Sequence, residues 1–243
     1  MYMDIEKWVM RSQQIHSKRQ LEHFCIEFGK EFGLKNYLLC VFTPTHLQEA
    51  ELFMVNNYPS EWLTRYFEHS YKHTDPVVMH CLNGITPILW QNTEVICQVK
   101  PECDINIMYE AQEFGLQDGI TVPLRGMGGE FGLFSYSTDT VIGMDDQMQI
   151  SSIMLGIVPF LYEAISRIQA KKSGVDIKLT QRELECMKWT AEGKTAWETA
   201  QILGVSERTV NFHVNNVIEK MGASNRQHAV AKVLLKGHLL PSI

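Results

Sequence analysis

The segment Thr195–Met221 constrains this chain more than any other part of its 243 residues. Within it, Ala196–Leu203 carries apolar residues at the spacing of one face of a short helix. Gly204 follows, and glycine ends a helix well because it adopts a positive φ without steric cost. Ser206 then offers an N-cap hydroxyl to a second helix. That helix is expected to end near Met221, with an inward stripe of Val210, Val214, Val217 and Met221. Two helices joined by such a turn are typical of a helix-turn-helix, whose second helix enters the DNA major groove.

The sequence around this segment resembles the C-terminal DNA-binding domain of LuxR-type transcription regulators. The resemblance is carried by LTQRELECMKWTAEGKT and then by ETAQILGVSERTVNFHVNNVIEKMGASNRQHAVAKVLLKGHL. One departure is Thr199, where the family usually has an aliphatic residue, and we expect looser packing of the first helix there. Glu183, Trp189 and Gly193 match the framework of the family. The resemblance also implies that the last helix pairs two such domains across a two-fold axis through His228, Ala231, Val233 and Leu234.

The outward side of the second helix carries the candidate DNA contacts. Asn211 and Asn215 are expected to read bases, because an asparagine amide can form a bidentate pair with an adenine edge. Arg208 and Phe212 lie beside them. Phosphate contacts are expected from Lys194, Thr209, His213, Asn216 and Lys220. For the two lysines the alternative is an ordinary solvated side chain.

Upstream of this domain the pattern predicts an α+β fold, an α-β-α sandwich with an antiparallel sheet, before an all-α helix-turn-helix domain. We expect a sensing domain at 1–171, a polar linker at 172–178 and a DNA-binding domain at 179–243. Helices are expected at Asp4–Ile15, Arg19–Phe32, Pro59–Tyr71, Glu102–Phe114 and about Met144–Lys171. Strands are expected at Asn36–Thr43, Glu51–Val55, Gly119–Arg125 and Glu130–Ser137. The stretch around Pro87 and Trp90 is expected to be irregular.

The segment NYPSEWLTRYFEHSYKHTDPVVMHC, followed by a tryptophan, resembles the autoinducer-binding domain of the same family, which binds acyl-homoserine lactones. The resemblance implies that Trp90 donates its indole N–H to the lactone carbonyl and that Asp75 accepts from the ligand amide N–H. Trp62 would donate to the amide carbonyl or the ring, and Tyr66 would pack on the acyl chain or bond to that carbonyl. Further hydroxyls are expected from Tyr58, Thr121 and Ser135. The apolar remainder of the pocket is expected from residues such as Phe42, Val77 and Ile107.

These residue types suit a buried amide. Each amide group left unpaired costs about 1–3 kcal/mol, and a carboxylate accepts only while an indole donates only. Together they distinguish the two ends of an amide. Each residue also has a structural alternative, because a tryptophan is often simple core and an aspartate before proline often caps a turn.

The composition limits the classes of protein to which this chain can belong. The chain is 45% apolar and 21% charged, which is typical of a globular protein. Its net charge is −6. The part from Leu179 onward has eight Lys/Arg and six Asp/Glu, a net charge of +2, so the preceding part carries −8. No apolar run reaches membrane length and no signal peptide is evident, so a cytoplasmic protein without membrane association is expected. The six cysteines lack zinc-type spacing and are expected to be reduced, with a redox pair of Cys97 and Cys103 as the alternative. No cofactor or metal is expected, because the histidines have no zinc-site spacing.

The leading hypothesis is therefore a ligand-controlled transcription regulator without enzymatic activity. Its expected partners are an acyl-homoserine lactone, double-stranded promoter DNA, a second copy of the chain and RNA polymerase. A response regulator is disfavoured, because the N-terminus lacks the acidic residues of a phosphorylated receiver domain. A lactone-cleaving enzyme is disfavoured because neither G-x-S-x-G nor H-x-H-x-D-H is present. A receptor of the same architecture that answers to another small molecule, or that folds without one, remains the alternative.

Overall fold

The computed structural model divides the chain into two compact units, with the main division between Lys172 and Ser173. The structure describes residues 5–46, 49–126, 128–173 and 178–239. Most of the expected linker at 172–178 lies outside the described residues.

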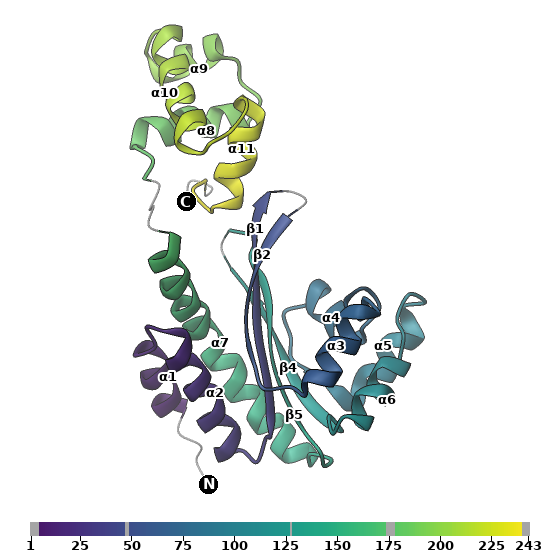
Figure 1. The fold of residues 1–243 in the computed structure, drawn as a ribbon. Coiled ribbons are helices and arrows are strands. Elements are labelled where there is room, and N and C mark those ends of the chain that lie inside the picture. Colours follow the sequence, from purple (N-terminus) through teal and green to yellow (C-terminus); the bar gives the residue numbers. More distant parts are fainter. Residues whose placement is uncertain (1–4, 47–48, 127, 174–177, 240–243) are drawn as a thin grey trace. The chain divides into compact units, whose positions relative to one another are not determined.

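A five-stranded sheet forms the middle of the N-terminal unit, with the strand order β2-β1-β5-β4-β3 (Figure 1). The strands are β1 Asn36–His46, β2 Glu49–Asn56, β3 Ile88–Leu89, β4 Asp118–Arg125 and β5 Phe131–Thr138. β5 runs antiparallel to both of its neighbours, and β3 runs antiparallel to β4. Ser135 of β5 lies opposite Leu38 of β1 and Thr121 of β4, and Phe131 lies opposite Phe42. The expected α+β class with an antiparallel sheet is confirmed.

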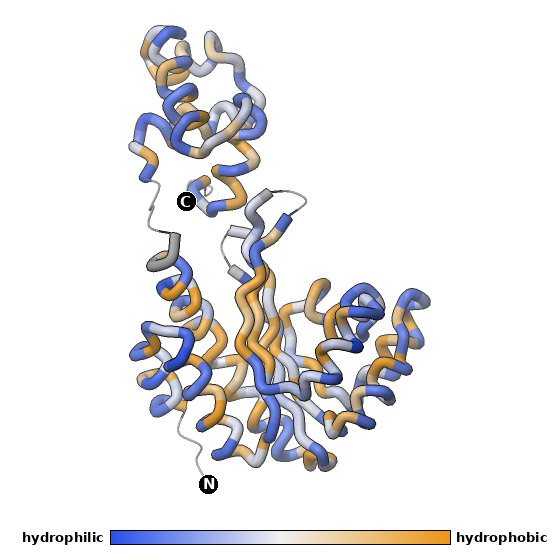
Figure 2. The backbone as a smooth tube through the Cα atoms, in the orientation of Figure 1, coloured by the Kyte–Doolittle hydropathy of each residue, from blue (hydrophilic) through white to orange (hydrophobic). Residues whose placement is uncertain are grey.

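Alternate residues of the central strands face two separate hydrophobic cores, because successive side chains of a strand point to opposite faces. Phe134 and Tyr136 of β5 join the core formed with α1, α2 and α7, whereas Leu133 joins the core formed with α3 to α6. Figure 1 shows these two groups of helices on opposite sides of the sheet. Figure 2 shows hydrophobic residues along the central strands between them. The helices are α1 Ile5–Gln13, α2 Lys18–Glu31, α3 Ser60–Glu68, α4 Pro76–Asn83, α5 Thr93–Val99, α6 Asn106–Glu113 and α7 Met144–Ser173.

Helix α7 is the long helix expected from the sequence. Its residues Met144–Ala170 are long and apolar enough to cross a membrane, which corrects the expectation that no apolar stretch reaches that length. Within this unit, however, Met154, Ile157 and Leu161 are fully buried against the sheet. α7 is therefore a core helix of the N-terminal unit, and its apolar composition reflects that burial.

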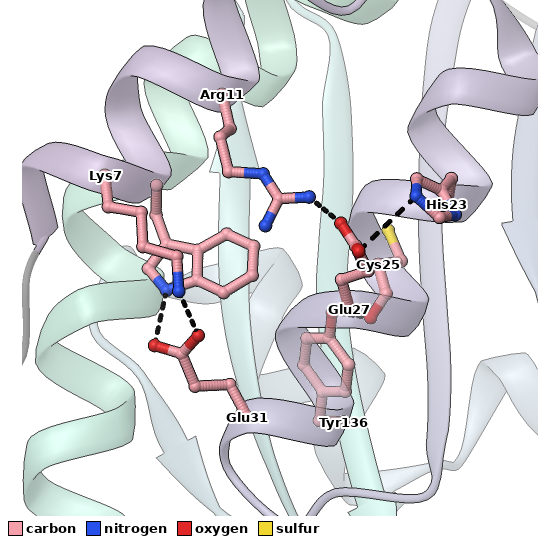
Figure 3. A network of polar contacts seen from close by, with 8 residues as sticks. Lys7, Arg11, His23, Cys25, Glu27, Glu31 and Tyr136 are labelled. Carbon is pink, nitrogen blue, oxygen red and sulfur yellow. Dashed lines mark hydrogen bonds and ion pairs between the residues drawn. The ribbon is translucent and has the colours of Figure 1, made fainter.

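Polar contacts hold α1 against α2 at the rim of the first core (Figure 3). Two ion pairs connect the helices: Lys7–Glu31 and Arg11–Glu27. Between them Trp8 is 1% exposed and packs edge-on against the phenylalanine rings of α2. Beneath this contact, the buried hydroxyl of Tyr136 donates to the carbonyl oxygen of Cys25 over 2.8 Å. The bond joins α2 to the sheet and satisfies a polar group that burial would otherwise leave unpaired.

The segment between β2 and β4 is more regular than the sequence indicates. The helix expected at Pro59–Tyr71 is α3, which is followed by a separate 3-10 turn at Tyr71–His73. The stretch expected to be irregular contains β3, a 3-10 turn at Trp90–Asn92 and then α5. A two-residue strand has no detectable period, and β3 exists because Ile88 and Leu89 pair with β4 far along the chain.

Cys97 of α5 and Cys103, in the segment between α5 and α6, form a disulfide, which corrects the expectation of six reduced thiols. Their Cα atoms lie 4.9 Å apart, within the range that a disulfide can span. The other four cysteines are free and buried: Cys25, Cys40, Cys81 and Cys186. Burial raises the pKa of the Cys40 thiol to about 12, against the opposing effect of a backbone hydrogen bond. Such a thiol is uncharged and unreactive near neutral pH.

The C-terminal unit contains four helices in its described part, α8 Gln181–Ala191, α9 Ala196–Leu203, α10 Glu207–Lys220 and α11 Arg226–Leu235. Capping boxes begin α8 and α9, and the Ser206 side chain accepts from the Thr209 N–H to begin α10. Gly204 ends α9 with φ +66°, as expected. The inward valines of α10, Val210, Val214 and Val217, are buried. The expected pair of helices and its turn are confirmed.

Thr199 is fully buried in α9, and its Oγ1 has no hydrogen-bond partner. A buried hydroxyl without a partner is unfavourable, since it has lost its hydration and gained nothing in return. This observation supports the expectation that threonine packs less well here than an aliphatic residue.

Candidate functional site

A cavity of about 220 Å³ lies between the sheet and helices α3, α4 and α6. Its floor is made by alternate residues of β1 and β5, which share one face of the sheet. Most of its lining is apolar, including all three apolar residues expected from the sequence, Phe42, Val77 and Ile107. Six of the polar-tipped residues expected at a ligand site also line it: Tyr58, Trp62, Tyr66, Asp75, Trp90 and Ser135.

Asp75 is the buried acidic residue of this cavity, 8% exposed, and it caps the N-terminus of α4. Its Oδ1 accepts from the backbone N–H groups of Val77 over 2.7 Å and Val78 over 3.3 Å. Its Oδ2 accepts from the hydroxyl of Tyr66 over 2.7 Å. Burial raises the pKa of Asp75, although these three hydrogen bonds favour the carboxylate and oppose the rise. The turn cap and the cavity role are therefore compatible, because each uses a different carboxylate oxygen.

A chain of hydrogen bonds crosses the sheet floor beside this carboxylate. The Trp90 indole N–H donates to Thr121 Oγ1 over 3.0 Å, and Thr121 Oγ1 lies 2.7 Å from Ser135 Oγ. The Tyr58 hydroxyl donates to Ser135 Oγ over 3.2 Å. Burial raises the pKa of Tyr58 to about 12, partly offset by bonds to serine hydroxyls, so this phenol stays protonated near neutral pH. Thr121 is buried, is not among the residues that line the cavity, and links Trp90 to Ser135; its expected contact with a ligand stays a prediction.

Two contacts position Trp90: a hydrogen bond from the next residue and close packing of the ring against a glycine. Its neighbour Gln91 donates to the buried carboxylate of Asp118 over 2.6 Å, which fixes the 3-10 turn on β4. The indole also lies directly against Gly119, where an added Cβ would come within 2.7 Å of the ring and 2.5 Å of the Tyr136 carbonyl oxygen. Only glycine at this position lets the ring lie on the strand.

Trp62 lies on α3 at 4% exposure, with its ring edge-on to Tyr66 at a centroid distance of 5.8 Å. An ionic contact holds α3 against the opposite wall of the cavity. Arg65 Nε donates to Glu110 Oε2 of α6 over 2.7 Å, and the Tyr71 hydroxyl donates to the same oxygen over 2.7 Å. Glu110 therefore joins α3, the following turn and α6, three of the elements around the cavity.

Several lining residues were not expected from the sequence. They come from strands β1, β2 and β5, from the helices that cover them and from the 3-10 turn after α3: Leu38, Cys40, Leu52, Met54, Leu63, Phe67, Lys72, Val78, Met108, Ala111, Phe131 and Leu133. The alternation of β1 and β5 contained the signal for the strand residues, but only the pairing of the strands shows which face covers the cavity.

In the C-terminal unit, the expected base-reading side chains Asn211 and Asn215 are exposed on α10. Phe212, between them in sequence, is 60% exposed and lies edge-on to His213. Thr209, His213 and Asn216 are half-buried, and the Thr209 hydroxyl lies 2.8 Å from the Ser206 hydroxyl at the start of the helix. Lys194, before α9, is also half-buried.

Lys220 has a structural role that its place in the sequence does not indicate. Its Nζ donates to both carboxylate oxygens of Glu183, over 2.7 and 2.9 Å. The Glu183 side chain is 3% exposed, and its oxygens also accept from the Thr180 backbone as part of a capping box. Burial alone would raise the pKa of Glu183, but the bonds from Lys220 and Thr180 outweigh it and lower the pKa. Lys220 thus neutralises a buried carboxylate, and its expected phosphate contact stays a prediction.

Within the described parts of the chain, no cluster of three or more histidine, cysteine or acidic side chains is arranged to hold a metal ion.

Comparisons with known proteins match both units of the chain. The family model for the autoinducer binding domain matches residues 17–163, and that for bacterial regulatory proteins of the luxR family matches residues 178–233. The chain is 36% identical to the transcriptional activator protein VanR of Vibrio anguillarum, over 98% of both chains. It is 34% identical to the transcriptional activator protein AhyR of Aeromonas hydrophila, over 89% of this chain and 84% of that one.

Among solved structures, Escherichia coli SdiA matches with a TM-score of 0.78 at 25% identity, over 98% of both chains. A complex of SdiA with octanoyl-rac-glycerol matches with a TM-score of 0.75 at 24% identity, over 97% of this chain and 96% of that one. This second likeness concerns the fold.

Proposed function

The chain belongs to the LuxR family of quorum-sensing transcription regulators, and we propose that it binds an acyl-homoserine lactone in the cavity of its N-terminal unit. We further propose that it binds a promoter operator as a homodimer and contacts RNA polymerase there. The matched domains and the activator relatives support a regulator without enzymatic activity.

The observation that carries the lactone proposal is the pairing of a buried acceptor with buried donors in an otherwise apolar cavity. Asp75 Oδ2 accepts from the Tyr66 hydroxyl, and a carboxylate oxygen has capacity for a second donor. A ligand amide N–H satisfies that capacity. The indole N–H of Trp90 donates to Thr121 and the Tyr58 hydroxyl donates to Ser135, and we propose that these donors exchange their protein partners for the carbonyl groups of the same ligand. An apolar acyl chain then suits the remaining lining.

The DNA proposal rests on the exposed face of α10. Asn211 and Asn215 are proposed to read bases, and phosphate contacts are proposed for Lys194, Thr209, His213, Asn216 and Lys220. The small positive charge of this unit implies that one copy alone holds DNA weakly, which favours a dimer.

Replacing Asp75 by Asn tests the lactone proposal. Melting temperatures of the full chain are measured with and without octanoyl-homoserine lactone, since a ligand that binds only the native state raises the melting temperature. The parent is expected to shift, and Asp75→Asn is expected to shift much less, because an amide can turn a donor toward the ligand N–H. Asp145→Asn, at an exposed position in the first turn of α7, is the matched control.

Octanoyl-glycerol has the same acyl chain without the amide, and it separates recognition of the head group from burial of the chain. A larger shift with the lactone than with the glycerol ester supports the proposal. Failure of every lactone to shift the parent would favour the receptor for another small molecule. Equal shifts in the parent and Asp75→Asn would leave Asp75 as a turn cap alone.

Binding of Asn211→Ala and Asn215→Ala to an operator selected with the parent protein tests the DNA proposal. Each change is expected to cost about 1–3 kcal/mol and to relax the preference at one base pair of each half-site. An unchanged base preference in both variants would contradict the assignment.

A further inference from the structure

The cavity has a polar end and an apolar end, and the strand register fixes their separation. Ser135 of β5, which is hydrogen-bonded to Thr121 on the neighbouring strand β4, marks the polar end. Along the same face of β5 the next cavity residues are Leu133 and then Phe131. Phe131 is four residues from Ser135, which corresponds to about 13 Å at the usual rise of a strand.

Two aromatic rings close together occupy the apolar end. Phe131 lies opposite Phe42 of β1 in the register, and their rings stack with centroids 6.0 Å apart and planes inclined by 13°. The guanidinium of Arg125 lies 4.9 Å from the centroid of the Phe131 ring. A ring held by a stacked neighbour and by a cation has little freedom to move aside.

Arg125 also connects this end of the cavity to the helix that carries Asp75. Its Nη2 donates to the carbonyl oxygens of Cys81 over 2.6 Å and Leu82 over 2.7 Å, at the C-terminal end of α4. Asp75 caps the other end of the same helix. Since α4 has 8 residues, its ends are about 12 Å apart at 1.5 Å per residue. The helix that separates Asp75 from the Arg125 contacts and the strand segment from Ser135 to Phe131 are thus of similar length.

We propose that the stacked rings of Phe42 and Phe131 form the end wall of the acyl-chain subsite and set the longest acyl chain that the protein accepts. This inference rests on the proposed binding of an acyl-homoserine lactone. Asp75 fixes the amide at one end of α4, and Arg125 fixes the wall at the other. A longer chain must therefore displace a ring or fold back on itself.

The wall has a measurable consequence for affinity. Each methylene that becomes buried contributes about 0.8 kcal/mol, which corresponds to about a fourfold gain in affinity. The gain is expected to continue until the tail meets the rings and then to stop or reverse. Removing one ring opens space beyond this point, so the preferred chain becomes longer by at least one two-carbon step.

The test is a competition in which the full chain is produced in the presence of an equimolar mixture of lactones. The mixture contains butanoyl, hexanoyl, octanoyl, decanoyl and dodecanoyl homoserine lactone, and the purified protein is analysed by mass spectrometry for the lactones it retains. The parent is compared with Phe131→Ala and Phe42→Ala. Phe67→Ala is the matched control, because Phe67 also lines the cavity but lies on α3 and is 52% exposed.

Both wall variants are expected to retain longer lactones than the parent, while Phe67→Ala keeps the distribution of the parent. The proposed end wall would be contradicted if both wall variants kept the parent's distribution of lactone chain lengths, or if Phe67→Ala alone shifted it. Retention of no lactone by the parent would overturn the proposed function as well, so the two failures are distinguishable. If an alanine variant does not fold, Phe131→Leu removes less volume and is expected to shift the distribution in the same direction.

Discussion

Replacing Lys220 by Met is expected to destabilise the C-terminal unit, because it leaves the carboxylate of Glu183 buried without its cation. The Glu183 side chain is 3% exposed, whereas that of Lys220 is 37% exposed. Removing one partner of a buried ion pair costs about 3–5 kcal/mol, and the partial exposure of Lys220 places this pair at about 3 kcal/mol. Replacing both partners, as in Glu183→Gln with Lys220→Met, is expected to recover most of that loss.

The pair also predicts a pH dependence. The pKa of folded Glu183 is lowered from its usual value of 4.5, since the bonds from Lys220 and Thr180 outweigh the effect of burial. The stability that it contributes is therefore complete above pH 4.5 and is lost as the pH falls through the folded pKa. Glu183→Gln removes this contribution, so the acid sensitivity of the unit is expected to decrease in that variant.

Hydrogen–deuterium exchange of the amides of α10, followed by mass spectrometry on the full chain, measures the effect within the unit concerned. Lys220→Met is expected to accelerate exchange about a hundredfold, which corresponds to about 3 kcal/mol. Lys194→Met removes a lysine of the same unit without touching Glu183, and is the matched control. Equal exchange in Lys220→Met and the parent would refute the structural role. The phosphate contact is tested separately by comparing DNA binding of the double variant with that of Glu183→Gln alone. If the salt dependence of binding has a slope lower by about one in the double variant, Lys220 also contacts a phosphate.

Three further predictions follow from buried or linked groups. Thr199→Val should stabilise the C-terminal unit by about 1 kcal/mol by removing a buried unpaired hydroxyl, and an unchanged or lower melting temperature would contradict it. Lactone affinity should fall as the pH falls, because protonated Asp75 loses acceptor capacity and its pKa is raised by burial; calorimetric titrations should show no such loss in Asp75→Asn. Replacing both Cys97 and Cys103 by Ser should cost about 2 kcal/mol through loop entropy, and reductant should lower the melting temperature of the parent but not of this variant.

The sequence by itself determined helices α9 and α10 of the C-terminal unit. The signals for α9 and α10 are local, since Gly204 and Ser206 act on backbone groups within a few residues and the valines of α10 repeat within one helix. The sensing cavity was predicted in part, because the resemblance located Asp75 and Trp90 on the chain and both line it.

Only the tertiary structure decided the contacts between distant segments. Ile88 and Leu89 become a strand because they pair with β4, and Phe131 meets Phe42 because β5 pairs with β1. Lys220 and Glu183 are 37 residues apart, and a lysine that neutralises a buried carboxylate has the same sequence signature as one that contacts a phosphate. Helical periodicity and helix capping depend on residues close together in the sequence, whereas strand pairing and burial depend on which distant segments the folded chain brings together.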